Sequence, residues 1–79
     1  PRLQYLAGMA CVQRELWGKA QQLLTRAAPL LQDPLLRTSA WQRLALMAEH
    51  RGDMEASAIA WKLAAQAMVV LPENPAREA

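Results

Sequence analysis

The sequence predicts an all-α fold, and three observations support this. The chain of 79 residues is 53% hydrophobic, yet Phe is absent and aromatic residues make up only 5%. Much of the apolar content is Ala and Leu, which are strong helix formers, and it recurs at steps of three and four residues. The β-branched aliphatic residues that a sheet would need are limited to Val12, Ile59, Val69 and Val70. One small domain is expected, near the size at which a single core offsets chain entropy.

The charge pattern does not favour binding to nucleic acid. Nine Lys and Arg against seven Asp and Glu give a net charge of +2, and the basic residues are spread along the chain rather than gathered on one face. No apolar run is long enough to span a bilayer. Because the chain begins with Pro1 rather than Met and has no signal peptide, we expect a soluble fragment of a longer protein.

The first helix is expected over residues 3–14, where two apolar stripes lie side by side. The first stripe is Leu3, Leu6, Ala7 and Ala10, and the second is Tyr5, Met9 and Val12. A helix with this much apolar surface is contacted on two sides or lines a groove. Residues 13–16 should form the turn that follows, and they include no glycine.

The second helix is expected over residues 17–31. Its apolar residues follow helical spacing and are Trp17, Ala20, Leu24, Ala27, Ala28 and Leu31. Pro29 removes a backbone hydrogen bond late in this run, so the helix should end or kink around residues 28–30.

The third helix is expected over residues 34–51. Asp33 followed by Pro34 is a start signal, because an acid suits the N-cap and Pro suits the first helical position. A later start near Ser39 stays open, since Thr38 and Ser39 can also cap. The residues expected to be buried are Leu36, Trp41, Leu44, Ala45 and Ala48.

The fourth helix is expected over residues 53–70. Gly52 fits the end of the preceding helix, because it takes the left-handed conformation without a Cβ clash, and Asp53 fits an N-cap. The apolar stripe of this helix is Met54, Ser57, Ala58, Trp61, Ala64, Ala65 and Met68. Trp41 and Trp61 should pack against each other's hairpin, with Trp17 partly exposed. Pro72 should stop the helix, leaving residues 72–79 as a disordered tail.

The two halves of the chain resemble each other at a shift of 37 residues. The equivalent pairs are Ala7 and Leu44, Gly8 and Ala45, Cys11 and Ala48, Ala20 and Ser57, Leu24 and Trp61, and Ala27 and Ala64. Self-similarity at such a period indicates a helical repeat protein, because one hairpin cannot bury both of its faces alone. The repeats are expected over residues 1–33 and 34–71, within a single domain covering 1–71.

This pattern resembles the tetratricopeptide repeat. The matching residues in the second repeat are Trp41, Leu44, Ala45, Gly52, Asp53, Ser57, Trp61 and Ala64, and those in the first are Ala7, Gly8, Trp17, Ala20, Leu24 and Ala27. The resemblance implies two tandem hairpins of antiparallel helices, a fragment of a right-handed α-solenoid, acting as a protein-interaction module. The family's usual period is slightly shorter than 37, so about three extra residues are expected within 33–37, as an added turn on the third helix.

Residues 11–24 also resemble the C-terminal repeat region of bacterial HemY proteins. The matching residues are Cys11, Val12, Glu15 to Gln21, Leu23 and Leu24. HemY proteins are inner-membrane proteins associated with heme biosynthesis. The resemblance implies a soluble interaction domain tethered to a bacterial membrane by segments outside this chain, without inserting into the membrane itself.

The tetratricopeptide resemblance also implies a peptide-binding groove on the concave face, formed by the first helix of each hairpin. By this spacing its lining residues are Tyr5, Met9, Val12, Gln42, Arg43, Leu46, Glu49 and His50. Some members grip a C-terminal carboxylate through Lys and Asn; the matching positions here are Tyr5, Met9 and Arg43, so two of three are lost. A more apolar peptide or another helix fits better. The alternative is that Met9, Val12 and Leu46 only pack against a neighbouring repeat or a second copy, which would make the chain a self-associating scaffold.

Metal and redox chemistry have less support. His50 lies near Glu49 and Asp53, but zinc needs three or four converging ligands. We expect a solvated histidine, favoured by its place near a helix C-terminus. Cys11 cannot form a disulfide within the chain, because it is the sole cysteine, and it is expected as a buried, inert thiol in a helix interface.

Catalysis and DNA binding are the remaining alternatives. No nucleophile, base and orienting group can be assembled from the spacing, and no Gly-rich phosphate loop is present. The sequence therefore predicts no catalytic residue and no cofactor. A helix-turn-helix DNA binder would need several polar side chains facing outwards on a recognition helix, and the fourth helix offers only Lys62 and Gln66 in its middle.

Overall fold

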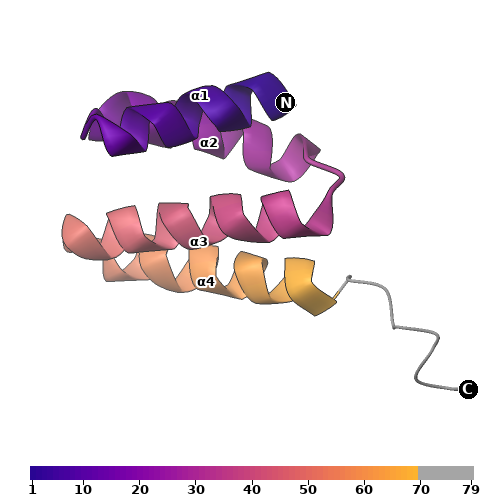
Figure 1. Ribbon diagram of the computed structural model, residues 1–79. Coiled ribbons are helices and arrows are strands. Elements are labelled where there is room, and N and C mark those ends of the chain that lie inside the picture. The colour runs from indigo at the N-terminus through magenta and orange to yellow at the C-terminus, as the bar shows by residue number, and fades with distance from the viewer. Residues whose placement is uncertain (70–79) are drawn as a thin grey trace, which may run out of the picture.

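The computed structural model describes residues 1–69, which form α-helices and a short 3₁₀ helix without any strand (Figure 1). The elements are α1 (Arg2–Gln13), α2 (Trp17–Ala27), η1 (Ala28–Leu30), α3 (Pro34–His50) and α4 (Met54–Val69). The all-α prediction is confirmed. The predicted stop at Pro72 and the predicted disordered tail over 72–79 lie outside the described residues.

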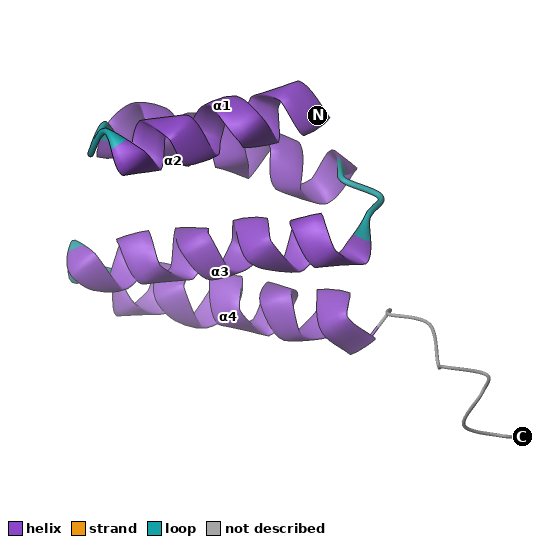
Figure 2. Cartoon of the chain, in the orientation of Figure 1, coloured by secondary structure: helices purple, strands orange, loops and turns teal. Residues whose placement is uncertain are grey.

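The helices form two hairpins that stack on each other. α1 packs on α2 and α3 packs on α4, while α2 and η1 pack on α3. Short loops join the helices of each hairpin at one side of the stack, and the connection from η1 to α3 lies at the other (Figure 2). α1 and α4 therefore lie at opposite ends of the stack (Figure 1).

The first hairpin turn has a left-handed residue where the sequence has no glycine. Glu15 has φ 61°. Its backbone N–H donates to the carbonyl of Val12 at 3.0 Å, and the N–H of Leu16 donates to the carbonyl of Cys11 at 2.8 Å. This is the Schellman arrangement, which satisfies the last carbonyls of a helix.

The second hairpin turn repeats this arrangement 37 residues later. Gly52 has φ 82°, its N–H donates to the carbonyl of Glu49 at 3.0 Å, and the N–H of Asp53 donates to that of Ala48 at 2.9 Å. The Asp53 side chain also caps α4, because its Oδ1 accepts from the N–H of Ala56 at 3.0 Å. The shift found in the sequence thus describes the backbone as well.

α3 begins at Pro34, so the later start near Ser39 does not occur. The Asp33 Oδ1 accepts from the N–H of Leu35 at 2.9 Å. Because Ser39 is the equivalent of Arg2, where α1 begins, α3 is extended at its N-terminus by residues 34–38. This extension contains the added turn expected between the repeats. The predicted effect of Pro29 is also observed, since α2 gives way to η1 after Ala27.

The core lies between the four helices and is rich in alanine. Its buried cluster is Tyr5, Ala20, Leu24, Ala27, Ala28, Leu31, Ala40, Leu44, Ala45, Met47 and Ala60. Gly8 lets α1 approach α2 closely, because a Cβ at this position would lie 2.8 Å from both Cγ and Cδ2 of Leu24. Leu24 is the largest fully buried side chain.

Two expectations about burial need correction. On α1, Leu3 and Leu6 are exposed, and the buried residues are Tyr5 and Gly8. On α4, the buried residues are Ser57, Ala60, Ala64 and Ala67, whereas the large Trp61 and Met68 are exposed. The reason is the same at both ends: these helices have a neighbour on one side only. Leu36 and Trp41, predicted as buried, are half-buried against the core.

A candidate interaction groove

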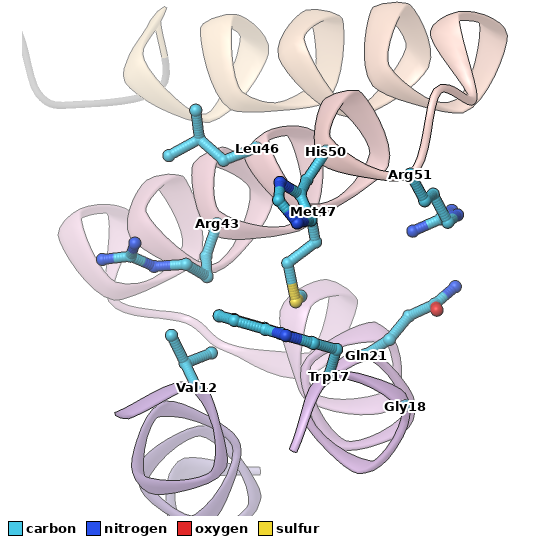
Figure 3. A pocket seen from close by; sticks show the side chains of 9 residues that line it. All are labelled: Val12, Trp17, Gly18, Gln21, Arg43, Leu46, Met47, His50 and Arg51. Carbon is cyan, nitrogen blue, oxygen red and sulfur yellow. The ribbon is translucent and has the colours of Figure 1, made fainter. Parts of the chain in front are cut away.

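A hollow lies between the turn end of the first hairpin and α3 (Figure 3). It has a volume of about 500 Å³. Its lining comes from three helices and the cap of α3: Val12, Trp17, Gly18, Gln21, Arg43, Leu46, Met47, His50 and Arg51. We call this hollow the groove.

The groove contains four of the eight residues that the tetratricopeptide resemblance places in a binding site. These are Val12, Arg43, Leu46 and His50. Gln42 is exposed without lining the groove, and Met9 is half-buried against the core. Of these four residues, three come from α3 and one from α1.

Tyr5 cannot serve as a groove surface because it is buried. Its hydroxyl donates to Oγ of Ser39 at 3.1 Å, which ties α1 to the start of α3. The correction has a packing reason. With Leu3 and Leu6 at the open end of the stack, the face of α1 that turns towards α3 carries Tyr5.

Glu49 also belongs elsewhere. Its Oε2 accepts from Oγ of Ser57 at 3.2 Å and from Nε1 of Trp61 at 2.6 Å, so the carboxylate points to α4. The second of these bonds satisfies the indole N–H of Trp61. The groove consequently has no acidic residue in its lining.

Trp17 is a groove residue that the sequence analysis did not place there. It is the first residue of α2 and is partly exposed, as expected. Its ring lies 6.3 Å from that of His50, tilted by 44°, and the thioether end of Met47 points at it from α3 (Figure 3). Trp17 is the first residue of α2, at the turn end of its hairpin. This position was the feature of the sequence that could have indicated a place in the groove.

The rim of the groove is basic. Arg43, His50 and Arg51 all line it. The Arg51 guanidinium lies 3.7 Å from the Asp53 carboxylate, but both side chains are exposed, so this pair is weak. Within residues 1–69 the structure shows no carboxylate partner for Arg43. An apolar floor with a cation at its edge suits an apolar side chain that has a carboxylate next to it.

Other candidate chemistry is not gathered in one place. In the described part of the chain, no three His, Cys, Asp or Glu side chains come together in a way that could hold a metal ion. Cys11 packs against the core but is half-buried rather than buried as predicted. None of the helices over residues 1–69 has the length and apolar character needed to cross a membrane.

Comparison of the chain with protein-family models, with curated proteins and with solved structures finds no match.

Proposed function

We propose that this chain is a tetratricopeptide-like protein-interaction module without catalytic activity. It binds a peptide or helix in the groove, by burying an apolar side chain and pairing a neighbouring carboxylate with Arg43. The observation that carries the proposal is the open apolar groove between two hairpins, with a basic rim and no acidic lining residue.

The apolar part of the groove supplies binding free energy. Trp17 and Leu46 are both exposed in the unbound chain, and Val12 and Met47 complete the floor. A volume of about 500 Å³ lies within the range of ligand-binding clefts, about 300–1,000 Å³. Aromatic and aliphatic side chains that lose water on binding are the usual source of interface energy.

The basic rim supplies orientation. The guanidinium of Arg43 can bind a carboxylate through two parallel hydrogen bonds, and Arg51 and His50, which also line the groove, add further donors. A ligand with lysine beside its apolar residue would face like charge and lose affinity. The proposed ligand is therefore an apolar segment flanked by Asp or Glu.

The tetratricopeptide-like arrangement is supported by the repetition of turn geometry, small buried residues and helix packing at the shift of 37. On the resemblance of residues 11–24 alone, we also propose that the module belongs to a HemY-like protein anchored in a bacterial inner membrane. Enzymes of heme biosynthesis are then the first whole proteins to test as partners.

The test compares two synthetic peptides, each with a pair of leucines flanked by glutamates or by lysines. Titration followed by calorimetry and amide NMR should show binding of the glutamate peptide, with shifts at Val12, Trp17 and Leu46. Leu46→Glu should weaken it by at least about tenfold, because burial of one leucine contributes about 1.5–3 kcal/mol. Leu35→Glu is the matched control, since Leu35 is an exposed leucine on the same helix outside the groove.

Charge reversal tests the orientation separately. Arg43→Glu should reverse the preference between the two peptides, whereas Arg37→Glu, an exposed arginine on the same helix, should leave it unchanged. Equal binding of both peptides by the original chain, or unchanged binding by Leu46→Glu, would overturn the proposal.

A further inference from the structure

At the α1 end of the stack, which we call the head, apolar residues of α1 are exposed although the equivalent residues of α3 are buried. Leu3 on α1 is 81% exposed, whereas Ala40, 37 residues later on α3, is 0% exposed. Ala7 and Ala10 are likewise exposed, while their equivalents Leu44 and Met47 are buried. We call Leu3, Ala7 and Ala10 the head face.

At the α4 end of the stack, which we call the tail, the residues of the second hairpin are exposed and their equivalents in the first hairpin are buried. Leu24 is 0% and Leu31 is 4% exposed, whereas their equivalents on α4, Trp61 and Met68, are 37% and 51% exposed. Ala28 is buried and its equivalent Ala65 is exposed. We call Trp61, Ala65 and Met68 the tail face.

These differences identify the joint between the hairpins. A position buried in one hairpin and exposed in the other is covered in part by the neighbouring hairpin; Leu24 packs on Gly8 of its own hairpin as well, where a Cβ would lie 2.8 Å from its side chain. The buried members belong to α2, η1 and the loop after it on one side and to α3 on the other, and all lie in one core cluster: Leu24, Ala28, Leu31, Ala40, Leu44 and Met47. α2 and η1 pack on α3. The tail face is thus equivalent to one side of this joint and the head face to the other.

We propose that the tail face of one copy packs on the head face of a second copy, in the geometry of the internal joint. The sizes of the side chains compensate at three positions, whereas Leu3 on the head face is larger than its internal equivalent, Ala40. The tail face is larger than its internal equivalent at Trp61, and the head face is smaller at Ala7 and Ala10, where α3 has Leu44 and Met47.

Head-to-tail packing gives a specific form of assembly. Because the head and the tail are different surfaces, the contact is heterologous and leaves one free face at each end. The number of copies in an assembly therefore increases with concentration and is not limited to two. α1 and α4 lie at opposite ends of the stack (Figure 1), so both faces are accessible at once.

The experiment uses one blocked variant for each face. Leu3→Glu blocks the head and Met68→Glu blocks the tail; both side chains are exposed, so the fold should be kept, and circular dichroism checks this. In sedimentation from micromolar to millimolar concentration, the original chain should grow beyond a dimer. Each variant alone should stay a monomer. Their mixture should give a one-to-one dimer and nothing larger, because each supplies the face that the other lacks.

Leu35→Glu is the matched control and should assemble like the original chain, since the exposure of Leu35 (68%) lies between those of Met68 and Leu3 and Leu35 belongs to neither face. A monomeric original chain at millimolar concentration would overturn the proposal. Dimerisation of Leu3→Glu alone would also overturn it, because it would indicate symmetric packing of two tail faces. The result is independent of the groove: Leu46→Glu should assemble normally, and Leu3→Glu should bind the peptide normally.

Discussion

Gly8→Ala gives the most direct test of the packing between α1 and α2. A methyl group at this position would lie 2.8 Å from Cγ and Cδ2 of Leu24 and 3.3 Å from Cβ of Leu23. Leu24 is fully buried, so it cannot move into solvent. Inserting a methyl group into a packed core costs about 1–3 kcal/mol, while Ala in place of Gly within a helix gains about 1 kcal/mol. We therefore expect a net loss of about 1 kcal/mol of unfolding free energy.

Two further variants separate the clash from helix propensity. Gly18→Ala meets nothing within 4 Å, so it should be neutral or stabilising by up to about 1 kcal/mol. In a Leu24→Ala background the clash is absent, and Gly8→Ala should then become stabilising. The coupling free energy of this double-mutant cycle is expected to be about 2 kcal/mol.

Urea unfolding followed by far-ultraviolet circular dichroism measures the original chain, the three single variants and the double variant. A loss of 1 kcal/mol also lowers the melting temperature by about 4–8 °C for a domain of this size. If Gly8→Ala proved as stable as the original chain, or if its effect were the same with and without Leu24, the close approach of α1 to α2 would not be what requires glycine.

The hairpin turns, the start of α2 and the hydrogen bond between Tyr5 and Ser39 give three more predictions, all measured by urea unfolding. Glu15→Gly should stabilise the chain by about 1 kcal/mol, because Glu15 has φ 61° and a left-handed backbone costs L-residues roughly 1–2 kcal/mol. Gly52→Ala should lower the unfolding free energy by a similar amount for the same reason. A change of the same sign in both variants would contradict this explanation. Leu16→Asp should stabilise the chain by about 1 kcal/mol. Leu16 is the N-cap residue of α2 and makes no side-chain capping bond, whereas the equivalent residue of α4, Asp53, does. No gain in stability would mean that an Asp side chain at position 16 cannot cap α2. Tyr5→Phe should cost about 1 kcal/mol, and adding Ser39→Ala should cost little more, because the two hydroxyls share one hydrogen bond.

Helix boundaries were readable from the sequence because local chemistry fixes them. Asp33 and Pro34 start α3, Pro29 ends α2, and Gly52 ends α3. The left-handed conformation of Glu15 was not readable, since no glycine marks it. There the hydrogen bonds of the turn and the packing of α1 on α2 hold a backbone that the residue itself disfavours.

The burial of individual apolar residues was less predictable, for a physical reason. Periodicity shows which residues share a helix face, but it does not show whether another element covers that face. Trp61 and Leu24 occupy equivalent positions, yet only Leu24 has a neighbouring hairpin over it. The same limit applies to the groove, where Trp17 and Met47 come together from separate hairpins.

Head-to-tail assembly would create a new hollow at each contact between copies, and the repeat shift indicates its chemistry. The equivalents of Val12 and Gly18 on the first copy are Glu49 and Glu55, and the equivalents of Arg43 and His50 on the second copy are Leu6 and Gln13. This hollow would be acidic on one side and would lack the counterpart of Arg43, and of the basic rim it would keep only Arg14, the equivalent of Arg51. Peptides flanked by glutamate should therefore bind only in the groove within each copy. Calorimetric titration should give one peptide per chain, both for the assembled original chain and for monomeric Leu3→Glu. A stoichiometry that rises on assembly would mean that the contact between copies forms a second binding site, and that the basic rim does not select the ligand.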